Sequence, residues 1–209
     1  MISLKYPKFC DHTLSALNTP HANTSTLLKK PPLRCIRMLI INLRQSELEI
    51  EVNRKCRKEA NKILKLGIGT PESPQKIKLR AFEALYLVYS GRAVIHKEGK
   101  ILDFNEALKE LSKIDEYVWP KFILVNDLLK RNYAVKKLSD REIEFLVSER
   151  RRDSPSEYIF YGVLEGKPLT FAKLRELIKK GFRMRKNIVL ALIDKEGNIT
   201  YYTLSYSGK

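Results

Sequence analysis

The chain has 209 residues, of which 44% are hydrophobic and 31% are charged. This globular composition excludes wholesale disorder, and no apolar run reaches the roughly 18–20 residues of a membrane span. The cysteines, Cys10, Cys35 and Cys56, fit neither a disulfide framework nor a zinc site. The first residues also lack the apolar block of a secretion signal. The sequence therefore predicts a cytoplasmic protein without a membrane anchor.

The charge balance indicates the class of partner. Forty lysine and arginine residues stand against 24 aspartate and glutamate residues, which leaves a formal net charge of +16. A charge of this size attracts a polyanion from a distance. We therefore expect nucleic acid, or a complex that binds it, as the partner. The alternative is a basic surface that is simply solvated.

The N-terminal half opens irregularly. Residues 1–37 contain four prolines and a stretch rich in serine, threonine and asparagine. We expect a flexible extension here, or a segment that does not belong to the native protein. An α+β N-terminal domain is expected over residues 38–114. It should begin with a strand at 39–43 and a charged helix at 47–66, which the glycines and prolines of 67–74 end.

The rest of this domain has clearer patterns. Apolar residues recur at helical spacing over 78–89, which predicts an amphipathic helix. Residues 93–102 predict a hairpin. Asp103 can cap a helix that runs to Leu111, because its carboxylate can accept from the free amides of the first turn.

A C-terminal α/β domain is expected over residues 115–209. It starts with a helix at 117–131, and Asn132 can adopt the left-handed conformation that ends a helix. After this residue the pattern becomes rich in strands, which we expect at the following positions: 133–135, 143–147 and 158–164.

The last third of the chain predicts a helix and a hairpin. The helix opens at residues 168–170 and stops at Gly181. Residues 188–193 are continuously apolar, which is typical of a central strand covered on both faces. A turn at 195–198 leads into an alternating partner strand at 199–204.

Catalytic residue types are scarce. The histidines are His12, His21 and His96, so the C-terminal domain has none, although histidine is the usual proton carrier near neutral pH. The sequence has no glycine-rich phosphate loop and no zinc-protease motif. Asp194 and Glu196 lie at a turn, where such residues are usually solvated. We therefore expect neither a metal nor a cofactor.

Two basic clusters suggest RNA binding. One lies between predicted strands and the other follows a helix end, where cations also favour the negative helix terminus. The residues expected to contact RNA are Arg150, Arg151, Arg152, Lys180, Arg183, Arg185 and Lys186. Nearby aromatic residues can either stack on bases or pack in the core, and they are Tyr158, Phe160, Tyr161 and Phe182.

Three segments, in order, resemble archaeal tRNA-splicing endonuclease subunits. They are LRAFEALYLVYSGRAVI at 79–95, YVWPKFILVNDLLKRNYAVK at 117–136 and RKNIVLALIDKEGNITYYTL at 185–204. The resemblance covers about residues 75–207 and implies an α+β N-terminal domain followed by an α/β tRNA-intron-endonuclease-type C-terminal domain. It also implies cleavage of precursor tRNA at bulge–helix–bulge junctions without a metal, giving a 2′,3′-cyclic phosphate.

The family uses a tyrosine, a histidine and a lysine, and this sequence keeps only one of them. Ser148 stands at the tyrosine position, and Pro155 or Ser156 stands nearest to the histidine position. Lys186 matches the lysine. A lone lysine supplies no acid–base pair. The resemblance therefore implies a non-catalytic, structural subunit that assembles with a catalytic paralogue, two of each, and acts on precursor tRNA.

The resemblance also suggests subunit contacts. In the family, the acidic loop of the closing hairpin enters a basic pocket of a neighbouring subunit, and here Asp194 and Glu196 occupy that loop. The last strand would meet a partner's strand through Ile199, Tyr201 and Thr203, or through the opposite set. Two alternatives remain open. One is a free-standing basic RNA-binding protein, and the other is an active ribonuclease rewired around Lys186 with Tyr158 or Tyr161.

Overall fold

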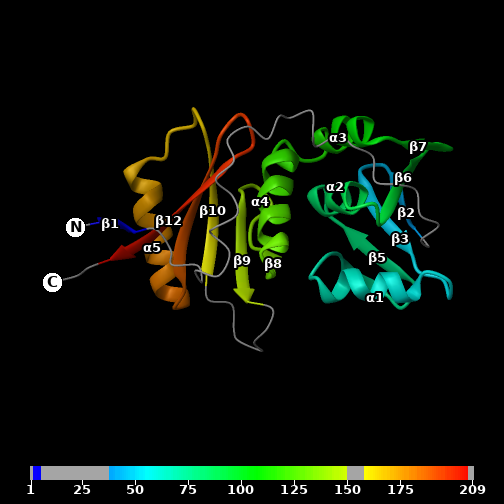
Figure 1. The fold of residues 1–209 in the computed structure, drawn as a ribbon, viewed down its shortest axis with the longest axis horizontal. Helices are drawn as coiled ribbons and strands as arrows, with labels where there is room; N and C mark the ends of the chain where they lie inside the picture. Colours follow the sequence, from blue (N-terminus) through cyan, green and yellow to red (C-terminus); the bar gives the residue numbers. More distant parts are fainter. Residues whose placement is uncertain (1, 6–37, 150–157, 207–209) are drawn as a thin grey trace, which may run out of the picture.

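The computed structural model describes residues 2–5, 38–149 and 158–206. Within these ranges the chain forms two six-stranded sheets and five helices (Figure 1). The order of elements confirms the predicted fold class, a mixed N-terminal part followed by an α/β C-terminal part.

The N-terminal sheet has the strand order β4-β5-β3-β2-β6-β7, and β2 runs parallel to β6. Its strands are β2 (Leu39–Arg44), β3 (Glu47–Glu51), β4 (Thr70–Ser73), β5 (Lys76–Leu79), β6 (Ala93–Lys97) and β7 (Lys100–Leu102). The accompanying helices are α1 (Arg57–Lys65), α2 (Ala81–Tyr89) and α3 (Phe104–Ser112). The predicted hairpin of β6 and β7 is confirmed, and Asp103 caps α3 by accepting from the Glu106 amide at 2.9 Å.

The helix predicted over 47–66 is wrong in its first part. Leu48 and Ile50 alternate with glutamates and are almost fully buried, so this stretch is a strand with period two. It forms a hairpin with β2, and the helix begins only at Arg57. The helix expected from residue 78 likewise begins at Ala81, because Leu79 pairs with Leu48 across the sheet.

The C-terminal sheet has the strand order β1-β12-β11-β10-β9-β8. Its strands are β1 (Ile2–Lys5), β8 (Tyr133–Lys137), β9 (Glu144–Glu149), β10 (Tyr158–Leu164), β11 (Asn187–Ile193) and β12 (Ile199–Tyr206). Helix α4 (Val118–Lys130) lies on one face of this sheet and α5 (Phe171–Met184) on the other (Figure 1). As predicted, β11 is central, and its two neighbours are β10, which is parallel to it, and β12.

One strand of this sheet was not predicted. Ile2–Lys5 pairs antiparallel with β12, from Tyr206 to Thr203. The expected flexible or non-native extension over residues 1–37 stays a prediction, because residues 1 and 6–37 lie outside the described part of the chain. The residues of β1 alternate between apolar and polar, but four residues are too few to identify a strand without its pairing partner.

Helix α4 joins the two sheets through one hydrophobic core. It packs against α2 on one side and the C-terminal sheet on the other (Figure 1). The rings of Tyr89 and Phe122 lie 5.3 Å apart, and those of Phe82 and Phe145 lie 5.4 Å apart, both in edge-to-face geometry. Asn132 ends α4 in the predicted left-handed conformation, with φ of 66°.

Helix α5 does not stop at Gly181, as predicted, but continues to Met184. The glycine is there because the helix approaches β11 closely. A Cβ at residue 181 would lie 2.7 Å from Ile188 Cγ1 and 2.9 Å from the Lys186 carbonyl oxygen. Arg185 ends the helix in the left-handed conformation, with φ of 52°.

We expect Gly181→Ala to destabilise the fold. Helix propensity alone would favour alanine by about 1 kcal/mol. Overpacking against a backbone carbonyl costs about 1–3 kcal/mol, so the net loss should be about 0–2 kcal/mol. Denaturant unfolding measures this change, with the exposed Lys179→Ala as a control expected within about 0.5 kcal/mol of wild type. Stabilisation by Gly181→Ala would show that the close approach does not matter.

Candidate functional site

Strand register brings Ser148 and Lys186, which stand at the family's tyrosine and lysine positions, to one edge of the C-terminal sheet. This edge is formed by the end of β9 and the starts of β10 and β11. Tyr158 at the start of β10 pairs with Val147 on β9 and with Asn187 on β11. Ser148 on β9 and Lys186, directly before β11, therefore lie at the same edge, with β10 between them. Two strand spacings put their backbones roughly 10 Å apart. Pro155, Ser156 and the cluster Arg150, Arg151 and Arg152 follow β9 and lie outside the described residues.

Both side chains belong to the sheet face that α5 covers. Leu146 and Ile188 pack in the smaller core beneath α5. Because side chains alternate along a strand, Ser148 shares the face of Leu146. Lys186 lines the groove along α5 together with Ile188. Both are partly exposed. The edge thus offers a hydroxyl and a cation on one side of the sheet.

The tyrosines considered for a rewired site lie elsewhere. Tyr158 packs on Phe160 in the larger core, on the opposite face of the sheet, with ring centroids 6.3 Å apart. Tyr161 pairs with Leu190, further along β10, and its hydroxyl lies 3.4 Å from Glu142 Oε1. Burial and the Glu142 charge raise the pKa of the Tyr161 phenol. Neither phenol is placed to act with Lys186.

Lys180 has a partner inside the chain. Its ammonium donates to both carboxylate oxygens of Glu144, at 2.7 and 2.6 Å. Glu144 on β9 is only 1% exposed, so its charge depends on this cation. The prediction that Lys180 contacts RNA is therefore not supported by this geometry, and the residue instead fastens α5 to β9.

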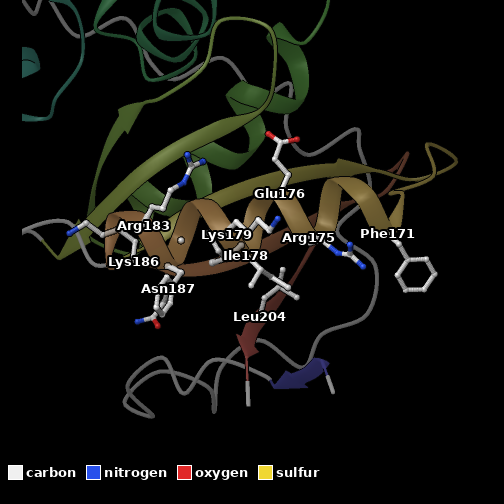
Figure 2. Close-up of a pocket in the computed structure, with 12 residues that line it drawn as sticks. Phe171, Arg175, Glu176, Ile178, Lys179, Arg183, Lys186, Asn187 and Leu204 are labelled. Carbon is white, nitrogen blue, oxygen red and sulfur yellow. The ribbon is translucent and has the colours of Figure 1, made fainter. Parts of the chain in front are cut away.

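The other cations of this cluster remain accessible. Arg183 and Arg185 are exposed, and Lys186 is partly exposed. They follow one another where α5 ends, and the Lys186 amide donates to the Gly181 carbonyl at 2.9 Å. Figure 2 shows Arg183 and Lys186 at the same end of α5.

Beside these cations a groove of about 1010 Å³ runs along α5. Its floor includes Ile188 and Leu204, and its rim includes Phe171 and Phe182, both 86% exposed. Of the aromatic residues expected either to stack or to pack, Phe160 is fully buried and Tyr158 and Tyr161 pack against core residues. Only Phe182 among them is free to meet a ligand. The sequence contained one signal for this difference, because the other three lie on the strand predicted at 158–164, whereas Phe182 follows the predicted helix.

The acidic turn between β11 and β12 has two different carboxylates. Asp194 accepts from the Asn198 amide at 2.7 Å and from Asn198 Nδ2 at 2.8 Å. These hydrogen bonds lower the pKa of the Asp194 carboxyl. Glu196 is exposed and forms an ion pair with Lys195 at 3.7 Å. Asp194 thus holds the turn, while Glu196 projects from it.

Two of the residues expected to contact a partner through β12 face inward instead. Ile199 and Tyr201 pack against the larger core, and the Tyr201 hydroxyl donates to Asp127 Oδ2 at 2.5 Å. Burial raises the pKa of the Tyr201 phenol, which keeps it a hydrogen-bond donor. Thr203 is partly buried and pairs with Lys5 of β1. This face of β12 therefore packs on α4, and the partner contacts of Ile199 and Tyr201 stay a prediction.

In the described ranges, no group of three or more histidine, cysteine, aspartate or glutamate side chains could hold a metal ion. No helix in the same ranges is long and apolar enough to cross a membrane.

Comparisons with known families agree with the two-part fold. The family described as tRNA intron endonuclease, N-terminal domain, matches residues 47–108. The family described as tRNA intron endonuclease, catalytic C-terminal domain, matches residues 118–201, which span α4 to β12 and include the edge with Ser148 and Lys186.

Individual relatives carry the name tRNA-splicing endonuclease. That of Methanococcoides burtonii is 30% identical over 135 residues, which cover 64% of this chain and 38% of the relative. That of Thermococcus onnurineus is 28% identical over 131 residues, covering 63% of this chain and 77% of the relative. The match thus spans well under half of the first relative and about three quarters of the second.

The ion pair at the end of α5 gives a direct test. We expect Lys180→Met to destabilise the protein by about 2–3 kcal/mol, because it leaves the buried Glu144 carboxylate without a cation. Denaturant unfolding measures the loss, and adding Glu144→Gln should recover part of it. RNA affinity at a temperature well below unfolding should stay unchanged. A stable Lys180→Met variant with weakened RNA binding would contradict this assignment.

Proposed function

Because the chain belongs to the tRNA intron endonuclease family, we propose that it is a structural subunit of a tRNA-splicing endonuclease. In this role it assembles with a catalytic paralogue and helps to hold precursor tRNA at its bulge–helix–bulge junctions. The observation that carries the proposal is the set of side chains at one sheet edge, where Lys186 lies near Ser148. No histidine is available to join them, because residues 115–209 contain none.

The chemistry expected of the family explains why this edge is insufficient. Attack of a ribose 2′-hydroxyl on the adjacent phosphate needs a base for the hydroxyl proton, an acid for the leaving oxygen and a cation for the developing charge. Lys186 can stabilise that charge. The serine hydroxyl at residue 148 is a poor base and a poor acid, and both nearby tyrosines are engaged elsewhere. This arrangement supports binding of the phosphate backbone without cleavage.

The same arrangement argues against the rewired ribonuclease. That alternative needs Tyr158 or Tyr161 beside Lys186, but Tyr158 packs on the other sheet face and Tyr161 lies against Glu142.

The second alternative, a free-standing RNA-binding protein, has no partner subunit and therefore gives Glu196 no role. Glu196 is an accessible carboxylate on a turn that the hydrogen bonds of Asp194 hold in place. A preformed acidic turn suits docking to a basic surface, such as a paralogous subunit would supply.

Intron excision tests the proposal. Alone, the purified chain should release no intron above the no-protein control. With a paralogue that keeps the tyrosine and histidine, the rate should rise at least about 10²-fold, the usual contribution of positioned acid–base groups. In the assembled enzyme, replacing the paralogue's histidine by alanine should abolish cleavage, whereas Ser148→Ala in this chain should change the rate less than about twofold. Cleavage by this chain alone would refute the structural role.

Docking through the acidic turn predicts a separate result. We expect Glu196→Lys to weaken assembly with the paralogue at least about tenfold, because a like charge then faces the basic surface. Thermal unfolding should not change, since Glu196 is exposed and holds no part of the turn. Analytical ultracentrifugation measures assembly. The control is Glu98→Lys, a charge reversal in an exposed turn of the N-terminal sheet, and equal effects of both variants would argue against docking by this turn.

A further inference from the structure

One face of α5 carries a stripe of two aromatic residues, one arginine and one isoleucine. Phe171, Arg175, Ile178 and Phe182 follow one another at intervals of three or four residues, so they share one side of the helix. All four line the groove beside β11 and β12. Figure 2 shows Phe171 at one end of the helix and Lys186 at the other. The stripe therefore ends at the edge of the sheet that holds Lys186.

The charges beside this stripe are mostly positive. Arg175, Lys179, Arg183 and Lys186 line the groove, and Glu176 is the one acidic residue among its lining residues. Two aromatic rings, each 86% exposed, thus stand among four cations. Exposed aromatic rings combined with cations are the usual means of binding unpaired nucleotides, since every base has a face that can stack and every nucleotide has a phosphate.

We propose that this α5 groove binds unpaired nucleotides of the RNA, with Phe182 as the main stacking surface. The inference rests on the proposed function, which supplies an RNA with bulged nucleotides. Phe182 is the stronger candidate because it lies closest in the chain to Lys186 and Arg183, where phosphates would be held. Phe171 lies about 16 Å away along the helix axis, so it would contact a different nucleotide.

Charge favours RNA over an apolar protein segment as the occupant. A purely apolar segment would leave four cations without partners around the groove, whereas an RNA strand neutralises them with its phosphates. The shape agrees, because the apolar floor of Ile178, Ile188 and Leu204 can accept base or ribose faces between the charged rims. The ring of Phe182 then positions a base without selecting which of the four bases binds.

The test compares two RNAs. The full chain is titrated with a bulge–helix–bulge RNA that carries 2-aminopurine at an unpaired position, and with a fully paired RNA of the same length. Phe182→Ala should raise the Kd for the bulged RNA about tenfold and abolish quenching of 2-aminopurine, while the Kd for the paired RNA stays within about twofold. Phe182→Trp should restore binding, and Phe182→Leu should not, because only a ring can stack.

Charge variants give a different signature. Lys179→Ala should weaken the binding of both RNAs and lower the slope of log Kd against log salt by about 0.7–0.9. Phe182→Ala should leave this slope unchanged. Met184→Ala, an apolar truncation outside the groove, should change nothing. Equal weakening of both RNAs by Phe182→Ala, or full binding by Phe182→Leu, would overturn the proposal.

The stacking proposal and the proposed function can each fail independently of the other. Cleavage by this chain alone would refute the structural role and leave the stacking measurement valid. If Phe182→Ala binds both RNAs normally but assembles poorly with the paralogue, the groove is a protein-docking surface and the stacking proposal is wrong.

Discussion

The parallel pairing of β10 with β11 is the constraint on which the C-terminal half depends. Parallel strands cannot be joined by a tight turn, so α5 crosses the sheet between them and returns the chain to the edge where β10 began. This return places Lys186 near Ser148. Gly181 allows the helix end to lie against β11, and the ion pair of Lys180 with Glu144 fastens the helix to β9. The position of the candidate site follows from this crossover.

The positive residues behind the net charge of +16 are of two kinds, those paired inside the fold and those exposed at the surface. Some cations stabilise the fold: Lys180 neutralises Glu144, and the fully buried Lys121 donates to Asp115 and to the Asp140 carbonyl. Others remain at the surface, as Arg183 does beside the exposed ring of Phe182. Only the second kind is available to the RNA of the proposed function, because removing a cation of the first kind would leave a carboxylate of the fold without its partner. Counting charges therefore overstates the binding surface.

In the proposed role, a domain of the endonuclease type that lacks a histidine would still supply features that hold RNA and subunits together. The sheet edge keeps its lysine, and the turn after β11 keeps a projecting glutamate, Glu196. The inner face of β12 packs on α4 through Tyr201. Architecture and catalysis can separate in this way because packing needs shape and burial, whereas catalysis needs particular side chains at particular atoms.

The sequence by itself determined the fold class, the central strand at β11, the cap at Asp103 and the left-handed end at Asn132, because each depends on local chemistry or on a long apolar run. The lack of histidine in the C-terminal half was equally plain. Only the tertiary structure decided that β3 is a strand, that Tyr201 faces inward and that Phe182 is exposed. Spacing along a chain defines the faces of an element, but pairing between distant segments decides which face is covered.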